Sequence, residues 1–274
     1  PFKEPLYDIL KRRELNKKEW IELKSHADKK GIHFFTTACY KDEVDFLVDK
    51  LNIDSIKVNS SDINQIDLIK YIARKKVNIQ LDTGSSDLWE IERAIIAIEE
   101  EGNDNVIIHH CPSGYPARLE SIHLKMIPTL KKMFPNYFVA FSDHSPGWEM
   151  DIAAISLGAG MVEKTITLDR FTKSCEHSYS LEGDSIKDFV SAVRNIEVAL
   201  GDERRILPKD LRLKRKNTRR SPYALRKIFK GELISRKDFE FKRPGKGISE
   251  EEFKILLNTS ISKDLEKGNF LDNE

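Results

Sequence analysis

The stretch SIKVNSSDINQIDLIKYIARKKVNIQLDTG (55–84) decides the fold. It opens and closes on short β-branched runs, Ser55–Val58 and Asn78–Leu81, and Ile66–Lys75 between them has apolar residues at helical spacing. A strand, a helix and a second strand at this distance indicate a right-handed βαβ unit with parallel strands.

The same alternation of strand and helix continues on both sides of this stretch. Helices are predicted at Lys17–Lys30, Asp42–Leu51, Asp87–Glu101, Leu124–Phe134, Met150–Leu157 and Phe189–Leu200. The strand-like runs, six in all, are Ile32–Thr37, Ser55–Val58, Asn78–Leu81, Val106–His110, Tyr137–Phe141 and Met161–Lys164.

Polar groups follow nearly every predicted strand. They are Thr37, the run from Asn59 to Asp62, Asp82-Thr83-Gly84, the run from His110 to Ser113, Ser142-Asp143-His144 and Glu163-Lys164. In a (β/α)8 TIM barrel the strand ends converge on one mouth, where active sites lie. A doubly wound sheet is the alternative, but it concentrates its ligand groups at one switch point. We expect the barrel, with six of eight units in this chain and the other two upstream of residue 1.

Composition excludes several classes of function. The 274 residues include 46 Lys and Arg against 45 Asp and Glu, a net charge of +1. Binding to nucleic acid or an anionic membrane as the main role requires a basic excess. No apolar run spans a bilayer, no secretory signal is visible, and Cys39, Cys111 and Cys175 form no CxxC pair. We therefore expect a cytoplasmic protein with reduced thiols.

The pattern changes after the last predicted helix. We expect a synthase domain over 1–200, a basic linker over 201–218 and a small, mostly β module over 219–274. Residues 204–220 carry nine Lys or Arg against one Asp. A nucleic-acid-binding arm is the alternative interpretation of this run, but it has no interleaved aromatic residues.

These motifs, in this order, resemble the sialic acid synthase family, in which a TIM barrel precedes an antifreeze-like (SAF) domain. The barrel segments are FFTT (34–37), KVNSSDINQIDLI (57–69), LDTGSSDLWEIERA (81–94), HHCPSGYP (109–116), FSDHSPG (141–147), VEKTITLDR (162–170) and SCEHSYSL (174–181). The SAF segments are RRSPYALRKIFKGELI (219–234) and KRPGKGIS (242–249).

The resemblance implies a nonulosonic acid synthase, which condenses phosphoenolpyruvate with an N-acetylmannosamine-type sugar and water and releases phosphate. The implied phosphoenolpyruvate pocket consists of Lys57, Thr37, Ser60, Ser113 and Ser142. Lys57, Asp62 and His144 are the implied catalytic residues, with Asp62 in the place of a family Glu. Asp82 replaces a Ser of relatives, and a carboxylate there would repel the anion unless it is protonated or paired with a cation.

The resemblance also implies a divalent metal, a partner subunit and sugar contacts. His144 is the metal ligand, for Mn²⁺, Mg²⁺ or Co²⁺, and Thr165 stands where the family has its second His, which should weaken the site. Tyr115 and Glu176 match sugar-contacting positions. Arg243 matches an arginine that reaches the other barrel of a domain-swapped homodimer.

Two further interpretations concern the histidines and the activity. His109 and His110 are interpreted as strand-end packing residues, with His177 as an outside candidate ligand. The substitutions at Asp82 and Thr165 leave open a second function, that of a catalytically impaired paralogue that binds sugar or a partner protein.

Overall fold

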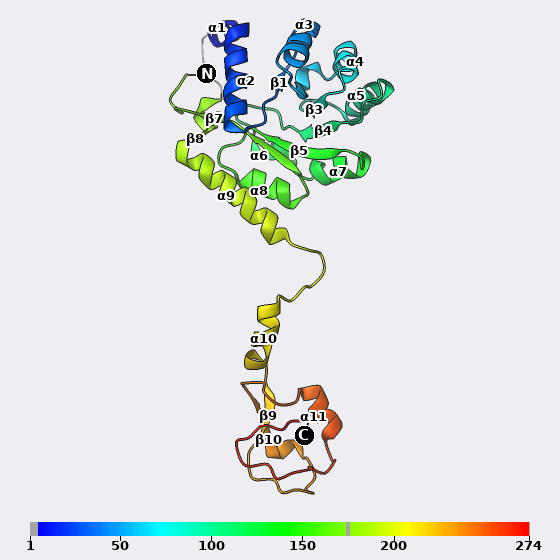
Figure 1. Ribbon diagram of the computed structural model, residues 1–274, viewed down its shortest axis with the longest axis vertical. Helices are drawn as coiled ribbons and strands as arrows, with labels where there is room; N and C mark the ends of the chain where they lie inside the picture. Colours follow the sequence, from blue (N-terminus) through cyan, green and yellow to red (C-terminus); the bar gives the residue numbers. More distant parts are fainter. Residues whose placement is uncertain (1–4, 174–175, 274) are drawn as a thin grey trace. The chain divides into compact units, whose positions relative to one another are not determined.

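A curled sheet of six parallel strands organises the first part of the chain (Figure 1). The computed structural model describes residues 5–173 and 176–273, so Cys175 lies outside the described residues. The strand order follows the chain without reversal, which fits part of a TIM barrel and is not the order of a doubly wound sheet. The strands are β1 (Thr36–Thr37), β2 (Ser55–Val58), β3 (Asn78–Asp82), β4 (Val106–His110), β5 (Phe138–Asp143) and β6 (Met161–Lys164).

The predicted helices are present, but the last one begins at Gly183 and not at Phe189, and the helices Leu6–Lys11, Leu119–Ile122 and Lys209–Thr218 were not predicted. Lys209–Thr218 lies within the segment expected to be a linker. Two further differences are local. The segment predicted as one helix over 42–51 divides into a short α-helix and a π-helical turn, and the strand predicted over 32–37 shortens to β1. In the described residues β1 pairs with β2 alone, and only Thr36 and Thr37 of the predicted strand pair with it. The elements are α1 (Leu6–Lys11), α2 (Lys17–Lys30), α3 (Lys41–Asp45), η1 (Phe46–Lys50), η2 (Ser60–Asp62), α4 (Ile66–Arg74), α5 (Leu88–Glu100), α6 (Leu119–Ile122), α7 (Met126–Met133), α8 (Glu149–Ser156), β7 (Ile166–Thr167), η3 (His177–Tyr179), β8 (Leu181–Glu182) and α9 (Gly183–Leu200).

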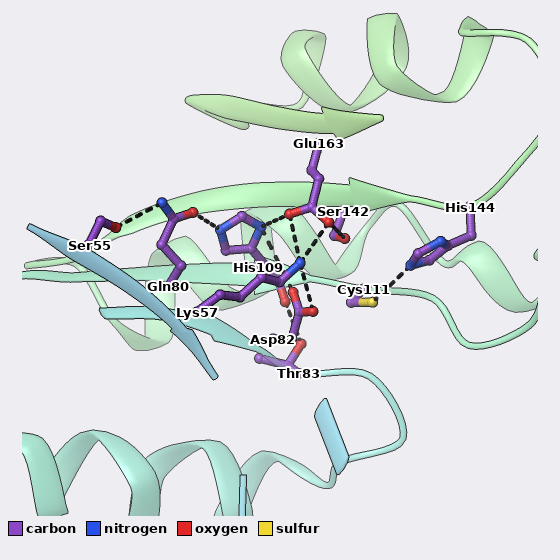
Figure 2. A network of polar contacts seen from close by, with 10 residues as sticks. All are labelled: Ser55, Lys57, Gln80, Asp82, Thr83, His109, Cys111, Ser142, His144 and Glu163. Carbon is purple, nitrogen blue, oxygen red and sulfur yellow. Dashed lines mark hydrogen bonds and ion pairs between the residues drawn. The ribbon is translucent and has the colours of Figure 1, made fainter. Parts of the chain in front are cut away.

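The two faces of the sheet differ in chemistry because successive strand residues point to opposite sides. On one face Ile56, Ile79 and Ile108 are fully buried and belong to the hydrophobic core that the helices complete. On the other face stand Lys57 and Asp82, together with further polar side chains of β3 to β6 (Figure 2). The polar face of the sheet is therefore the place to look for a site.

The second compact unit, Asp202–Glu274, has its own core. It contains α10 (Lys209–Thr218), β9 (Ser221–Ala224), η4 (Arg236–Asp238), β10 (Phe239–Lys242) and α11 (Glu250–Leu256). Strands β9 and β10 pair antiparallel, and Phe239 packs edge-on against Phe253. A search of the described helices found none that is both long and apolar enough to cross a membrane.

Candidate active site

Lys57 is the centre of an ion cluster on the polar face of the sheet (Figure 2). Its Nζ donates to both carboxylate oxygens of Glu163, at 2.6 and 2.7 Å, and lies 3.0 Å from Oδ2 of Asp82. The Lys57 and Asp82 side chains are only 12% and 8% exposed. The sequence analysis expects Asp82 to repel an anion unless it is protonated or paired with a cation. The structure shows the second of these, because Asp82 is paired with Lys57.

Burial and the cluster charges set the protonation of these three groups. Burial raises the pKa of Asp82 to about 6, although Lys57 acts against it. Burial also acts to raise the pKa of Glu163, but Lys57 outweighs it and that pKa is lowered. For Lys57 burial acts to lower the pKa, and the charges of Asp82 and Glu163 reverse this and raise it. At neutral pH one ammonium therefore faces two carboxylates.

His109 stands beside the cluster, at the end of a chain of hydrogen bonds. Ser55 Oγ donates to Asn78 Oδ1 at 3.1 Å, and Gln80 Nε2 donates to Ser55 Oγ at 3.1 Å. Gln80 Oε1 is then left as an acceptor 2.9 Å from His109 Nε2, so Nε2 carries the ring proton. Burial lowers the pKa of His109 to about 4, and its ring is neutral with a bare Nδ1.

This arrangement corrects the interpretation of His109 as a packing residue. Its Nδ1 is buried, has no hydrogen-bond partner, and lies 3.9 Å from both Asp82 Oδ1 and Glu163 Oε2. His110 does pack, since its ring lies against Phe141 and its Nε2 contacts the backbone oxygen of Ile122 at 2.6 Å.

The structure places Ser142 in the cluster and Ser60 in η2, after β2. Ser142 donates to Glu163 Oε1 at 3.1 Å. Ser60 packs against Gly84, where a Cβ would lie 3.2 Å from Ser60 Oγ and 3.0 Å from the backbone oxygen of Cys111. Glycine at position 84 therefore lets the loops after β2, β3 and β4 meet.

Ser113, Thr37 and Asp62 are the remaining candidates for the phosphoenolpyruvate pocket and for catalysis. Ser113 shares a 2.7 Å hydrogen bond with Ser85. Thr37 is paired in register with Lys57 and lines a cavity of about 300 Å³. Asp62 follows β2 in η2 and hydrogen-bonds Cys39, whose thiol pKa is raised to about 11, by burial first and then by Asp62.

The sugar-site candidates divide between the two units. Tyr115 packs edge-on against the His144 ring, with 4.7 Å between ring centroids. Glu176 acts on His144 electrostatically, in the direction that raises its pKa. Arg243 is exposed and belongs to the second unit. His177 contacts Thr167 Oγ1 through Nδ1, at 2.6 Å.

Among the described residues, the donor atoms around His144 do not form a set of three metal ligands. Nε2 of His144 lies 3.7 Å from Cys111 Sγ, and burial lowers the pKa of this His and raises that of the Cys111 thiol to about 12. A neutral thiol is a poor ligand because metals bind the thiolate. Thr165 Oγ1 and His144 Nδ1 are buried without hydrogen bonds, and no group of three His, Cys, Asp or Glu within residues 5–173 and 176–273 converges on one point.

A second buried ion cluster supports the loop that carries His144. Lys164 pairs with Asp143 and lies 3.3 Å from Asp151 Oδ2, and all three side chains are at most 2% exposed. Asp143 in turn accepts from the backbone N–H of Ser145 at 2.9 Å. Burial, followed by the charge of Asp143, raises the pKa of Asp151 to about 8.

Sequence analysis omitted Glu163, His109 and Gln80 from the site residues, although a signal for Gln80 exists. In Ser55-Ile56-Lys57 and Gln80-Leu81-Asp82 polar residues alternate with apolar ones, whereas β6 shows no such alternation around Glu163. In a parallel sheet covered on both faces the expected run is continuously apolar. Polar residues two apart in such strands therefore mark the face that holds the site.

The fold and this site define the class of the protein: a parallel α/β protein of the partial TIM-barrel type, with a lysine-centred ion cluster on one face of its sheet. The sequence model of the NeuB family matches residues 2–205, and the chain belongs to that family.

Its relatives include synthases of N,N'-diacetyllegionaminic acid and of pseudaminic acid. The N,N'-diacetyllegionaminic acid synthase of Legionella pneumophila is 32% identical over 97% of this chain and 75% of its own length. The pseudaminic acid synthase of Campylobacter jejuni is 34% identical over 92% of this chain and 73% of its own. An uncharacterised protein of Methanocaldococcus jannaschii is 35% identical over 98% of this chain and 79% of its own.

Solved structures agree with this assignment. The N-acetylneuraminic acid synthetase of Leptospira borgpetersenii superimposes with a TM-score of 0.70 at 28% identity, over 76% of this chain and 72% of that one.

Proposed function

We propose that this chain is a nonulosonic acid synthase, which joins phosphoenolpyruvate to an N-acetylmannosamine-type sugar and releases phosphate. The observation that carries the proposal is the buried Lys57 ammonium, in a cluster that the Ser142 hydroxyl joins through Glu163, in a chain of the NeuB family. A fixed cation with hydroxyl donors suits a substrate that carries both a carboxylate and a phosphate.

The proposed reaction forms one C–C bond and breaks one C–O bond. C3 of phosphoenolpyruvate attacks C1 of the open-chain sugar, whose aldehyde oxygen takes up a proton. Water adds to the cationic C2, loses a proton, and the tetrahedral intermediate collapses with release of phosphate. In this scheme Lys57, Thr37, Ser60, Ser113 and Ser142 hold the anion.

The sugar would lie between His144 and the loops that follow β4 and β6. Asp62 reaches both substrates, and Tyr115 and Glu176 bind the sugar. The contact of Tyr115 with His144 supports this placement, because it brings the two candidate rings next to each other.

A divalent metal and a domain-swapped homodimer complete the proposal. A metal would polarise the aldehyde, but no step above depends on one, since the donors around His144 do not form a three-ligand set. In the dimer the SAF module, residues 219–274, would bring Arg243 to the other subunit's sugar site. We also propose that the protein works in the cytoplasm.

The second candidate is a sugar- or partner-binding protein without turnover. One observation favours it: three carboxylate oxygens of Glu163 and Asp82 already lie within 3.0 Å of Lys57 Nζ. An anion must displace one of them to bind.

Phosphate release separates the two functions. Phosphoenolpyruvate is supplied with N-acetylmannosamine or a diacetylated 6-deoxy analogue, with Mn²⁺ or with chelator. Sugar-dependent release supports the synthase, and the effect of chelator reports on the metal. A folded protein that binds sugar and releases no phosphate with any of them is the binding protein instead.

A further inference from the structure

The Lys57 ammonium is already engaged by carboxylates. An ammonium has three N–H donors, and three carboxylate oxygens lie within 3.0 Å of its nitrogen. Glu163 supplies two of them and is held in place by Ser142. Asp82 supplies only one, at the longest distance. Asp82 is therefore the group that an incoming anion displaces.

A displaced Asp82 cannot remain ionised without a large penalty. The residue is 6% exposed, and its Oδ1 is buried with no hydrogen-bond partner. A carboxylate that loses its cation in such a place, beside a second anion, strongly favours the neutral form.

An acceptor for the proton of a neutral Asp82 is already present. Nδ1 of His109 is bare, because the chain from Asn78 through Gln80 keeps the ring proton on Nε2. This buried nitrogen has no partner and lies 3.9 Å from Asp82 Oδ1. A shift of about 1 Å would make an O–H···N hydrogen bond of ordinary length.

We propose that Asp82 is a proton-coupled gate on the Lys57 anion site: an acidic substrate takes the place of Asp82 on Lys57, and Asp82 binds one proton from solvent, which it donates in a hydrogen bond to His109 Nδ1. That the anion is phosphoenolpyruvate rests on the proposed function. The exchange itself needs only a carboxylate or phosphate that reaches Lys57.

The titratable groups that face Asp82 leave it as the group that titrates near neutral pH. They are Lys57 on β2, His109 on β4, Cys111 after β4 and Glu163 on β6. Lys57 and Glu163 stabilise each other's charged forms, so their pKa values move away from neutrality, while burial keeps His109 and Cys111 neutral. Asp82, with a pKa of about 6 in the free protein, is ionised at pH 8 and can accept a proton there.

Calorimetric titration with phosphoenolpyruvate at pH 8, in two buffers of different ionisation enthalpy, counts the protons bound. A phosphate monoester is almost fully ionised at this pH, so the ligand itself brings no proton. We expect the unaltered protein to take up about one proton per anion and its Kd to rise about tenfold per pH unit above pH 7. Binding without proton uptake overturns the gate.

Two variants locate the proton. Asp82→Asn already has a neutral side chain with an N–H that can reach His109, so uptake falls to zero and binding at pH 8 tightens. Asp82→Glu keeps a titratable carboxyl and keeps the uptake. Unchanged uptake in Asp82→Asn overturns the proposal, because the proton then goes elsewhere.

Titration with inorganic phosphate distinguishes failure of the Asp82 gate from failure of the proposed synthase function. Asp82-dependent proton uptake with phosphate, in a protein that does not bind phosphoenolpyruvate, supports the gate and overturns the substrate. Phosphoenolpyruvate binding with no proton uptake overturns the gate and leaves the substrate standing. A protein that binds neither anion at any pH overturns both.

Discussion

Lys57 and Glu163 are 106 residues apart in the chain, yet Lys57 Nζ lies 2.6 and 2.7 Å from the two carboxylate oxygens of Glu163. The pair connects β2 with β6 across the polar face of the sheet (Figure 2). These two strands are not neighbours in the sheet, so only the curl of the sheet brings their side chains together. Most of the predictions below concern this centre.

Replacing Lys57 should abolish turnover. Lys57→Ala removes the cation that binds the substrate anion and leaves two carboxylates facing each other, and we expect kcat/KM for phosphate release to fall by at least about 10³-fold. Lys75→Ala is the matched control, because it removes a surface lysine that pairs with Asp45 and Asp49 at 2.7 Å. It should change stability by about 1 kcal/mol or less and leave turnover unchanged. Normal turnover in Lys57→Ala contradicts the assignment.

His109 should be a neutral ring with its proton on Nε2. Nitrogen-15 NMR of the imidazole reports the tautomer directly, and we expect the Nε2–H form to persist down to about pH 4, since burial lowers this pKa to about 4. Gln80→Leu removes the acceptor and should cost about 1–3 kcal/mol of stability, as a buried donor is left unpaired. An Nδ1–H ring in the native protein contradicts the hydrogen-bond chain described here.

Asp151 should make the protein less stable as pH rises. Its pKa is raised from an ordinary 3.8 to about 8, so the folded state binds the proton more tightly than the unfolded state. The resulting stability is present at low pH and is lost between about pH 4 and pH 8, by at most about 1.4 kcal/mol per pH unit. Urea unfolding of the native protein and of Asp151→Asn from pH 5 to pH 8 isolates this slope, since Asp82 and His109 titrate in both. Equal slopes in the two proteins rule the effect out.

Gly84 should not tolerate a side chain. An added Cβ meets the backbone oxygen of Cys111 at 3.0 Å and Ser60 at 3.2 Å, so Gly84→Ala should cost about 1–3 kcal/mol and raise the KM for phosphoenolpyruvate. At Gly160 the nearest atom is 3.8 Å away, and Gly160→Ala should stay within about 0.5 kcal/mol. Denaturant midpoints and KM measured on both variants check this, and the prediction is wrong if the two behave alike.

Thr165→His should raise the affinity for Mn²⁺. A second imidazole would join His144, and we expect a gain of at least about tenfold, or 1.4 kcal/mol, over the native chain. Equilibrium dialysis measures it, and adding His144→Ala to the variant should remove the gain. Unchanged Mn²⁺ affinity in Thr165→His means that the two positions do not share a metal.

Sequence patterns predicted much of the fold. The helical spacing of apolar residues located α2 and α5, and short β-branched runs located β2 and β4 with their observed ends. These predictions succeed because an element that buries one face has apolar residues at regular spacing in the sequence. The break of the 42–51 helix was not predicted. A π-helical turn changes the hydrogen-bond partner by one residue and has no distinct composition.

The sequence by itself determined the order of strands and helices, the polar residues at the strand ends and membership of a family of synthases, since each is written in local pattern or in motifs. Only the tertiary structure decided the partners: that Asp82 and Glu163 share Lys57, and that His109 turns a bare nitrogen toward both carboxylates. The physical reason is that pairing and burial depend on which strands the curl of the sheet brings together. The identity of a charged residue in the sequence does not show whether its side chain contacts water, a partner residue or a substrate.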